Sequence, residues 1–187
     1  STGVSDISSA TASTFALTST QIGTYVRVQV TGTNSAGTAT AYSTPTAAVA
    51  GIAPANTAVP TITGTTTTGQ TLTAHDGTWT GDPAPSYSYQ WQQCTSSDCS
   101  TGVSDISSAT ASTFALTNAQ IGTYVRVQVT GTNSAGTTTA YSNPTAVIAG
   151  IAPAVTHGVE VAGTAVSGQT LTASADTWSG EPTPTVG

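Results

Sequence analysis

The chain has 187 residues, a formal net charge of −6, two Arg and no Lys, and only 5% of its residues are charged, against about 25% in an average globular protein. Two cations are too few for the phosphate contacts of nucleic-acid binding, and the anionic surface of a membrane would repel the chain. No apolar run approaches the roughly 20 residues that span a bilayer, and the first residues lack the basic start and apolar core of a signal peptide.

Ser and Thr together number 64 of the 187 residues. Disordered chains combine low hydrophobicity with high net charge. Here the hydrophobic fraction is 37%, and its Val, Ile, Leu, Tyr and Trp residues favour strands, as Thr does. The composition therefore predicts a folded β protein whose polar character comes from hydroxyl groups.

The sequence contains an internal repeat. Residues 1–54 recur at 100–153 with six conservative differences in 54 positions, and a looser match at the same offset of 99 continues toward the last residue. A fixed period of this kind is typical of tandem arrays. Because near-identical copies carry the same side chains, a residue that recurs in both copies is a poor candidate for a unique active site.

The repeat predicts three parts, in chain order. Residues 1–51 are the C-terminal half of one unit, residues 52–150 are a complete unit, and residues 151–187 are the N-terminal part of the next. The two incomplete parts together lack only the strand equivalent to Tyr89–Cys99. We expect a slice of a longer repetitive polypeptide. The alternative is strand complementation, in which an incomplete sandwich borrows strands from a neighbouring subunit, and the missing strand counts against it.

The complete unit reads as short strands separated by turn residues, the pattern of an all-β sandwich. We expect a loop around Trp79, between Asp76-Gly77 and Gly81-Asp82-Pro83, and a hairpin turn at Asn133–Gly136. The predicted strands are Val59–Thr63, Gln70–Ala74, Tyr87–Gln92, Thr113–Leu116, Tyr124–Thr132, Thr137–Tyr141 and Thr145–Ala149.

Alternation with a period of two predicts which side chains face the core. It is clearest where Val125, Val127 and Val129 alternate with polar residues, as in a half-buried strand. For Trp79, a platform for carbohydrate is the alternative to packing over the end of the core, which we favour because Trp is usually mostly buried. The predicted core residues are Leu72, Trp79, Trp91, Phe114, Leu116, Val125, Val127 and Val129.

Four motifs of the unit resemble those of a known family. They are Gly69-Gln70-Thr71-Leu72, Gly77-Thr78-Trp79, Tyr89-Gln90-Trp91-Gln92 and Ile121-Gly122-Thr123-Tyr124-Val125-Arg126-Val127. They are similar to the bacterial immunoglobulin-like repeats that occur in tandem in large secreted and cell-surface proteins. The resemblance covers the whole unit and implies tandem immunoglobulin-like β-sandwiches of about 99 residues. It implies no activity, because this sandwich carries many functions.

The sequence departs from antibody-type domains in two ways. No Cys in the second strand is available for an inter-sheet disulfide. Gly122-Thr123-Tyr124 looks like the start of a tyrosine corner, but a corner would place Arg126 at a buried position. Because alternation turns the valines inward, we expect Tyr124 and Arg126 to be at least partly exposed.

The two cysteines, Cys94 and Cys99, are separated by four residues rich in Ser and Asp. We expect a disulfide that closes a small loop, which would indicate an oxidising, extracellular setting. The alternatives are a redox pair or a metal site. Zinc takes four ligands, and His75 and His157, which are not repeat equivalents, are the only histidines.

Catalytic and cofactor motifs are absent from the sequence. Asp6 and Asp105 are repeat equivalents, as are Asp82 and Glu181, which favours a structural role. There is no nucleophile elbow, no glycine-rich dinucleotide loop and no EF-hand loop. We therefore expect no enzyme activity, no cofactor and no metal site.

The junctions between units are the short segments 50–54 and 149–153. We expect their Ile52, Pro54, Ile151 and Pro153 to form semi-rigid linkers, with each Ile packed between units. The chain is then expected to be a structural segment of an extracellular filament, fibre or cell-surface stalk. Its partners would be other copies or neighbouring repeats. The competing hypothesis is an adhesin whose inter-strand loops bind a glycan or a surface receptor.

Overall fold

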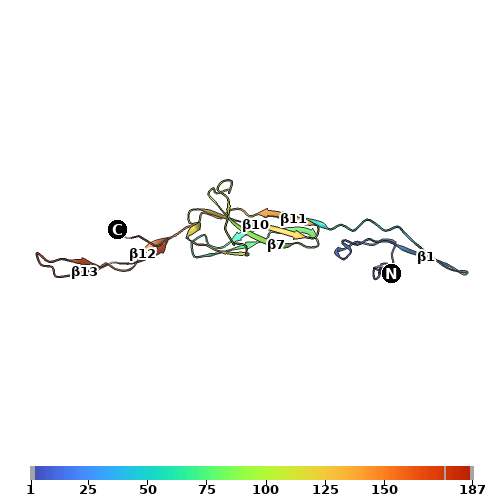
Figure 1. Ribbon diagram of the computed structural model, residues 1–187, viewed down its shortest axis with the longest axis horizontal. Helices are drawn as coiled ribbons and strands as arrows, with labels where there is room; N and C mark the ends of the chain where they lie inside the picture. Colours follow the sequence, from blue (N-terminus) through green and yellow to red (C-terminus); the bar gives the residue numbers. More distant parts are fainter. Residues whose placement is uncertain (1–2, 175, 186–187) are drawn as a thin grey trace.

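The computed structural model describes residues 3–174 and 176–185, and the regular secondary structure of these residues is almost entirely β. Two single-turn 3₁₀ helices, η1 (Ser19–Gln21) and η2 (Asn118–Gln120), are the exceptions in this part of the chain. Figure 1 shows an elongated molecule, with the complete unit in the middle and the incomplete parts at opposite ends. In the described residues, no helix has the length and apolar character needed to cross a membrane.

The complete unit folds as an all-β sandwich with antiparallel sheets. One sheet has the order β11-β10-β7-β8, a second has the order β4-β5-β9, and β3 pairs with β6. The strands are β3 (Ile52–Ala58), β4 (Thr61–Thr63), β5 (Thr71–His75), β6 (Thr78–Asp82), β7 (Ser86–Cys94), β8 (Ser104–Asp105), β9 (Thr113–Ala115), β10 (Tyr124–Asn133) and β11 (Gly136–Tyr141).

The core lies between the two larger sheets. Leu72 on β5 and Trp91 on β7 are buried, and the Trp91 ring lies 5.6 Å from the ring of Phe114 on β9. On β10 every second residue is buried, so Val125, Val127 and Val129 face inward between half-buried polar neighbours. The period of two that is visible in the sequence is therefore the period of the fold.

Three segments differ from the sequence prediction. Strand β3 (Ile52–Ala58) begins within the expected linker at 50–54, and the expected loop around Trp79 is strand β6 (Thr78–Asp82). The pairing of β3 with β6 is irregular between Ile52 and Ala55, around Pro54. Proline has no N–H to donate and interrupts a ladder, so Pro and Ala obscure the strand signal in the sequence.

The predicted last strand at 145–149 is not a regular strand. It runs beside the segment between β4 and β5 through a single parallel bridge between Thr67 and Ala149. Ala149 N–H donates to the Thr66 carbonyl (2.8 Å), and Thr68 N–H donates to the Ala149 carbonyl (2.9 Å). The segment between β4 and β5 and the last segment of the unit are thus hydrogen-bonded side by side.

The incomplete parts repeat the pairing of the complete unit. β1 (Gln29–Asn34) and β2 (Gly37–Tyr42) have the register of β10 and β11, displaced by 99 residues. The described remainder contains β12 (Ile151–His157), β13 (Val161–Ala162), β14 (Thr172–Ala173) and β15 (Thr177–Glu181). β12 and β15 reproduce the register of β3 and β6, including the irregularities.

Candidate functional site

The N-terminal part exposes side chains that the complete unit buries. Leu17 and Val30 are 55% and 61% exposed, whereas their repeat equivalents Leu116 and Val129 are 2% and 0% exposed. The local pairing is the same in both copies, so the difference arises from the sheet that covers one copy and not the other. Residues 3–51 therefore present an uncovered apolar face.

The C-terminal part presents the opposite half of the same core. Leu171 is 50% exposed, and its equivalent Leu72 is 1% exposed. Trp178 is 40% exposed, whereas Trp79 is partly buried against the core. In the complete unit, strands of these two kinds cover each other, so the two uncovered faces have complementary sequences.

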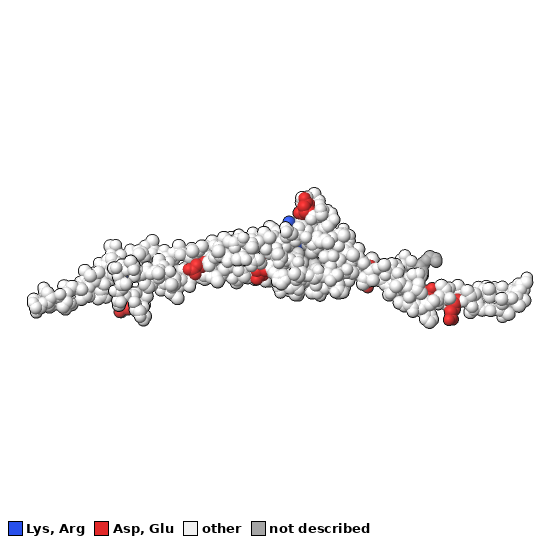
Figure 2. All heavy atoms as spheres, turned by 180° about the vertical axis from the view of Figure 1, so that it is seen from behind, with Lys and Arg blue, Asp and Glu red and all other residues white. Residues whose placement is uncertain are grey.

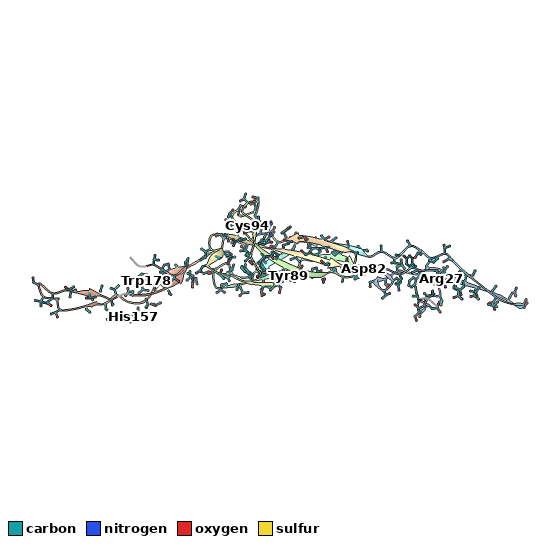
Figure 3. All side chains as sticks on the ribbon, viewed as in Figure 1. Arg27, Asp82, Tyr89, Cys94, His157 and Trp178 are labelled. Carbon is teal, nitrogen blue, oxygen red and sulfur yellow. A yellow bond between two sulfur atoms is a disulfide. The ribbon has the colours of Figure 1, made fainter. Side chains whose placement is uncertain are left out.

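Cys94 and Cys99 form a disulfide. It closes a loop that projects from the side of the complete unit, with Cys94 at its base (Figure 3). Ser100 N–H donates to Ser96 Oγ and to Asp98 Oδ1, each at 3.0 Å. These hydrogen bonds lower the pKa of Asp98 to about 2: the bond from the Ser100 backbone has the largest effect, and bonds with the Ser96 and Ser100 side chains have smaller ones. The loop therefore holds a carboxylate in solvent by local hydrogen bonds.

Charged side chains are sparse on the surface (Figure 2). The Arg126 guanidinium lies 4.5 Å from the centre of the Tyr141 ring, and its Nε donates to Gln92 Oε1 at 2.8 Å. Gln92 in turn donates to Asp105 Oδ1 at 2.7 Å. Arg126 and Tyr124 are both half-buried. The arginine thus takes part in a network on the sheet surface and does not belong to a basic patch.

Trp79 is held at the edge of the core. Its Nε1 donates to the Asp76 carbonyl at 2.8 Å, and a Cβ added to Gly131 would lie 3.1 Å from its ring. The Tyr89 hydroxyl donates to Asp76 Oδ1 at 2.6 Å, and this hydrogen bond, with burial, raises the pKa of Tyr89 to about 12. The Trp79 side chain is therefore packed and hydrogen-bonded within the unit.

The four predicted linker residues differ in how deeply they are buried. Ile52 and Ile151 are 63% and 48% exposed, so the expectation that each packs between units is wrong. Both begin strands, β3 and β12, whose side chains face alternate sides. Pro54 is buried in the complete unit, and Pro153 is exposed.

Other isoleucines lie at the junctions. A Cβ added to Gly51 would lie 3.5 Å from Ile22 Cδ1, and one added to Gly150 would lie 3.4 Å from Ile121 Cδ1. Ile22 and Ile121 are both half-buried. Sequence reasoning missed them because each directly follows a 3₁₀ turn, far from the linker in sequence.

Asn133 has a role beyond its predicted hairpin turn. Its Nδ2 donates to the carbonyls of Ile52 (2.8 Å) and Pro83 (2.7 Å), while its Oδ1 accepts from Ala135 N–H (2.9 Å). One side chain thus ties the tip of the β10–β11 hairpin to the start of the unit. The hairpin motif was visible in the sequence, but its partners were not.

The described residues contain no group of three or more His, Cys, Asp or Glu side chains arranged to hold a metal ion. His75 shares a hydrogen bond with Thr63 Oγ1 at 3.0 Å. No protein-family model matches the chain, and no curated protein shows significant similarity to it. The features of the described residues that distinguish this chain are the uncovered apolar faces, the disulfide loop and the junctions between units.

Proposed function

We propose that the chain is a structural segment of an extracellular filament, fibre or cell-surface stalk built from tandem immunoglobulin-like domains. The observation that carries this proposal is the recurrence of one strand register in successive copies, as in β1–β2 and β10–β11. Near-identical units in line suit a role set by length and spacing, because each unit contacts only its neighbours.

The surface chemistry supports an extracellular location. The Cys94–Cys99 disulfide favours an oxidising compartment. The absence of Lys and the presence of only two Arg leave few sites for trypsin-like proteases. Both properties suit a protein that must persist outside the cell.

The uncovered faces support completion of each incomplete part by a neighbouring repeat or subunit. Leu17 and Val30 need a front half-unit to cover them, and Leu171 needs a back half-unit. Burying one such aliphatic side chain contributes about 1.5–3 kcal/mol. Burying a face that contains several of them therefore strongly favours association. The partner is another copy of the same repeat.

Electron microscopy of the native material tests the proposal. We expect beaded filaments or stalks with a constant spacing between beads. Isolated globular particles would contradict it. The mass of the native polypeptide separates the two ways of completing a half-unit. A subunit near 18.4 kDa indicates strand sharing between subunits, and a much larger mass indicates tandem repeats in one polypeptide.

An adhesin is the second candidate, favoured by the projecting disulfide loop. A loop that is closed by a disulfide and internally hydrogen-bonded loses little entropy when it binds a ligand. A glycan array tests this function. Binding that disappears in Asp98→Ala, while the unfolding midpoint is unchanged, supports the adhesin. An array without signal for the parent chain excludes the glycans that the array presents.

A further inference from the structure

The connection between successive units is a single residue. The N–H and the carbonyl of Ala149 are both hydrogen-bonded within the complete unit, to the Thr66 carbonyl and the Thr68 N–H. Ile151 is already paired with Glu181 in the next unit. Only Gly150 stands between these two ladders, so no free linker separates the units.

Gly150 is in a confined space. A Cβ at this position would collide with the Glu181 carbonyl oxygen and lie 3.4 Å from Ile121 Cδ1, and Gly150 does not have a positive φ. Close approach, and not backbone conformation, therefore requires glycine. The contacts come from both sides, because Ile121 belongs to the complete unit and Glu181 to the next one.

A hydrogen bond also crosses the junction. Asn118 Nδ2 donates to Glu181 Oε2 at 2.6 Å, and Asn118 Oδ1 accepts from the buried Thr68 hydroxyl at 3.0 Å. The amide of Asn118 is thus oriented by its own unit and bonded to the carboxylate of its neighbour. A charge-assisted bond to an oriented amide favours one angle between the units.

The preceding junction repeats this arrangement with smaller polar groups. A Cβ at Gly51 would lie 2.7 Å from the Asp82 carbonyl oxygen and 3.1 Å from Ala135 Cβ. The residues equivalent to Asn118 and Glu181 are Ser19 and Asp82. No hydrogen bond joins these two side chains, both of which the structure describes. The close approach is common to both junctions, and the polar bond differs between them.

We propose that the end of each unit and the start of the next form a rigid joint. Its parts are the confined glycine, the isoleucine after the 3₁₀ turn, and the acidic residue of the following unit. The Asn118–Glu181 pair is a variable element that sets the stiffness of an individual joint. The inference rests on the proposed tandem array and names the neighbouring unit as the partner of this surface.

Backbone ¹⁵N relaxation of the full oxidised chain tests the joint. In the parent chain, the R2/R1 ratios of amides in β12 and β15 should match those in β7 and β10, as for a single tumbling body. Gly150→Ala should lower the ratio in β12 and β15 only. Gly158→Ala is the matched control, because a Cβ there meets nothing within 4 Å, and it should leave all ratios unchanged.

A second pair of variants tests the polar bond without crowding the backbone. Glu181→Ala should lower the ratio in β12 and β15, and Glu160→Ala, which removes an exposed carboxylate elsewhere in the same part, should not. Independent tumbling of β12 and β15 in the parent chain would overturn the rigid joint. Equal ratios in the parent and Glu181→Ala would overturn the role of the pair.

The joint and the proposed function fail in different experiments. Filaments seen by microscopy together with independently tumbling units would overturn the joint alone. If the chain tumbles as a single body but the native material contains no filaments, the structural function is overturned and the joint stands.

Discussion

Two single substitutions by alanine, at the repeat-equivalent Leu72 and Leu171, test whether the complete unit is a self-sufficient sandwich. Leu72 is 1% exposed inside the core, and Leu171 is 50% exposed. Leu72→Ala removes a buried isobutyl group and leaves a cavity, at a cost of about 3 kcal/mol. With a urea m-value of about 1.5 kcal/mol/M, this cost lowers the unfolding midpoint by about 2 M. Leu171→Ala leaves the complete unit untouched.

Urea unfolding followed by tryptophan fluorescence measures both variants, since Trp91 is fully buried in the complete unit. We expect the main transition of Leu171→Ala to coincide with that of the parent chain, and that of Leu72→Ala to fall to a much lower urea concentration. Equal shifts of the two variants would refute the reasoning, because they would show that the incomplete part folds together with the complete unit.

Three further predictions concern polar and covalent contacts of the complete unit. The hydrogen bond to Asp76 raises the pKa of Tyr89 to about 12, against about 10 for a free tyrosine. The hydrogen bond therefore contributes fully to stability below pH ~10, and this contribution is lost as the pH rises toward 12. Urea unfolding across this pH window should show the loss in the parent chain and not in Tyr89→Phe. Reduction of Cys94–Cys99 should lower the free energy of unfolding by about 2 kcal/mol, measured with and without reductant. Asn133→Ala should cost about 1–2 kcal/mol, because two strand-end carbonyls lose their donor, and an unchanged midpoint would contradict this.

The sequence was sufficient to predict the fold class and the strands that alternate regularly. Alternation with a period of two identified the inward valines of β10 without any tertiary information. Strand β3 was missed because Ile-Ala-Pro-Ala carries no alternation and contains proline. Its strand character depends on β6, whose paired residues lie 20 to 30 positions away along the chain. A local pattern does not show pairing that is imposed from outside.

The junction was predicted in position but not in chemistry. The expectation relied on Ile52 and Ile151, the largest apolar residues of the linker. The side chains that reach Gly51 and Gly150 instead come from Ile22 and Ile121, which the repeat alone does not connect to the linker. Contacts of this kind depend on how the end of one sandwich meets the next, and no periodicity in the sequence encodes that geometry.

The parallel bridge between Thr67 and Ala149 has a mechanical consequence. The neighbouring parts attach at opposite ends of the complete unit (Figure 1), so tension along the molecule pulls the segment 66–68, which is reached through β3 and β4, and the last segment in opposite directions. The two hydrogen bonds of Ala149 to Thr66 and Thr68 are then loaded in shear and must break together. Hairpins such as β10–β11 have both strand ends on one side and would peel one bond at a time. On its C-terminal side a pulled unit would therefore resist extension first at this short parallel contact, and the rate at which the contact ruptures would set the strength there. On its N-terminal side the pairing of β3 with β6 would bear the load first.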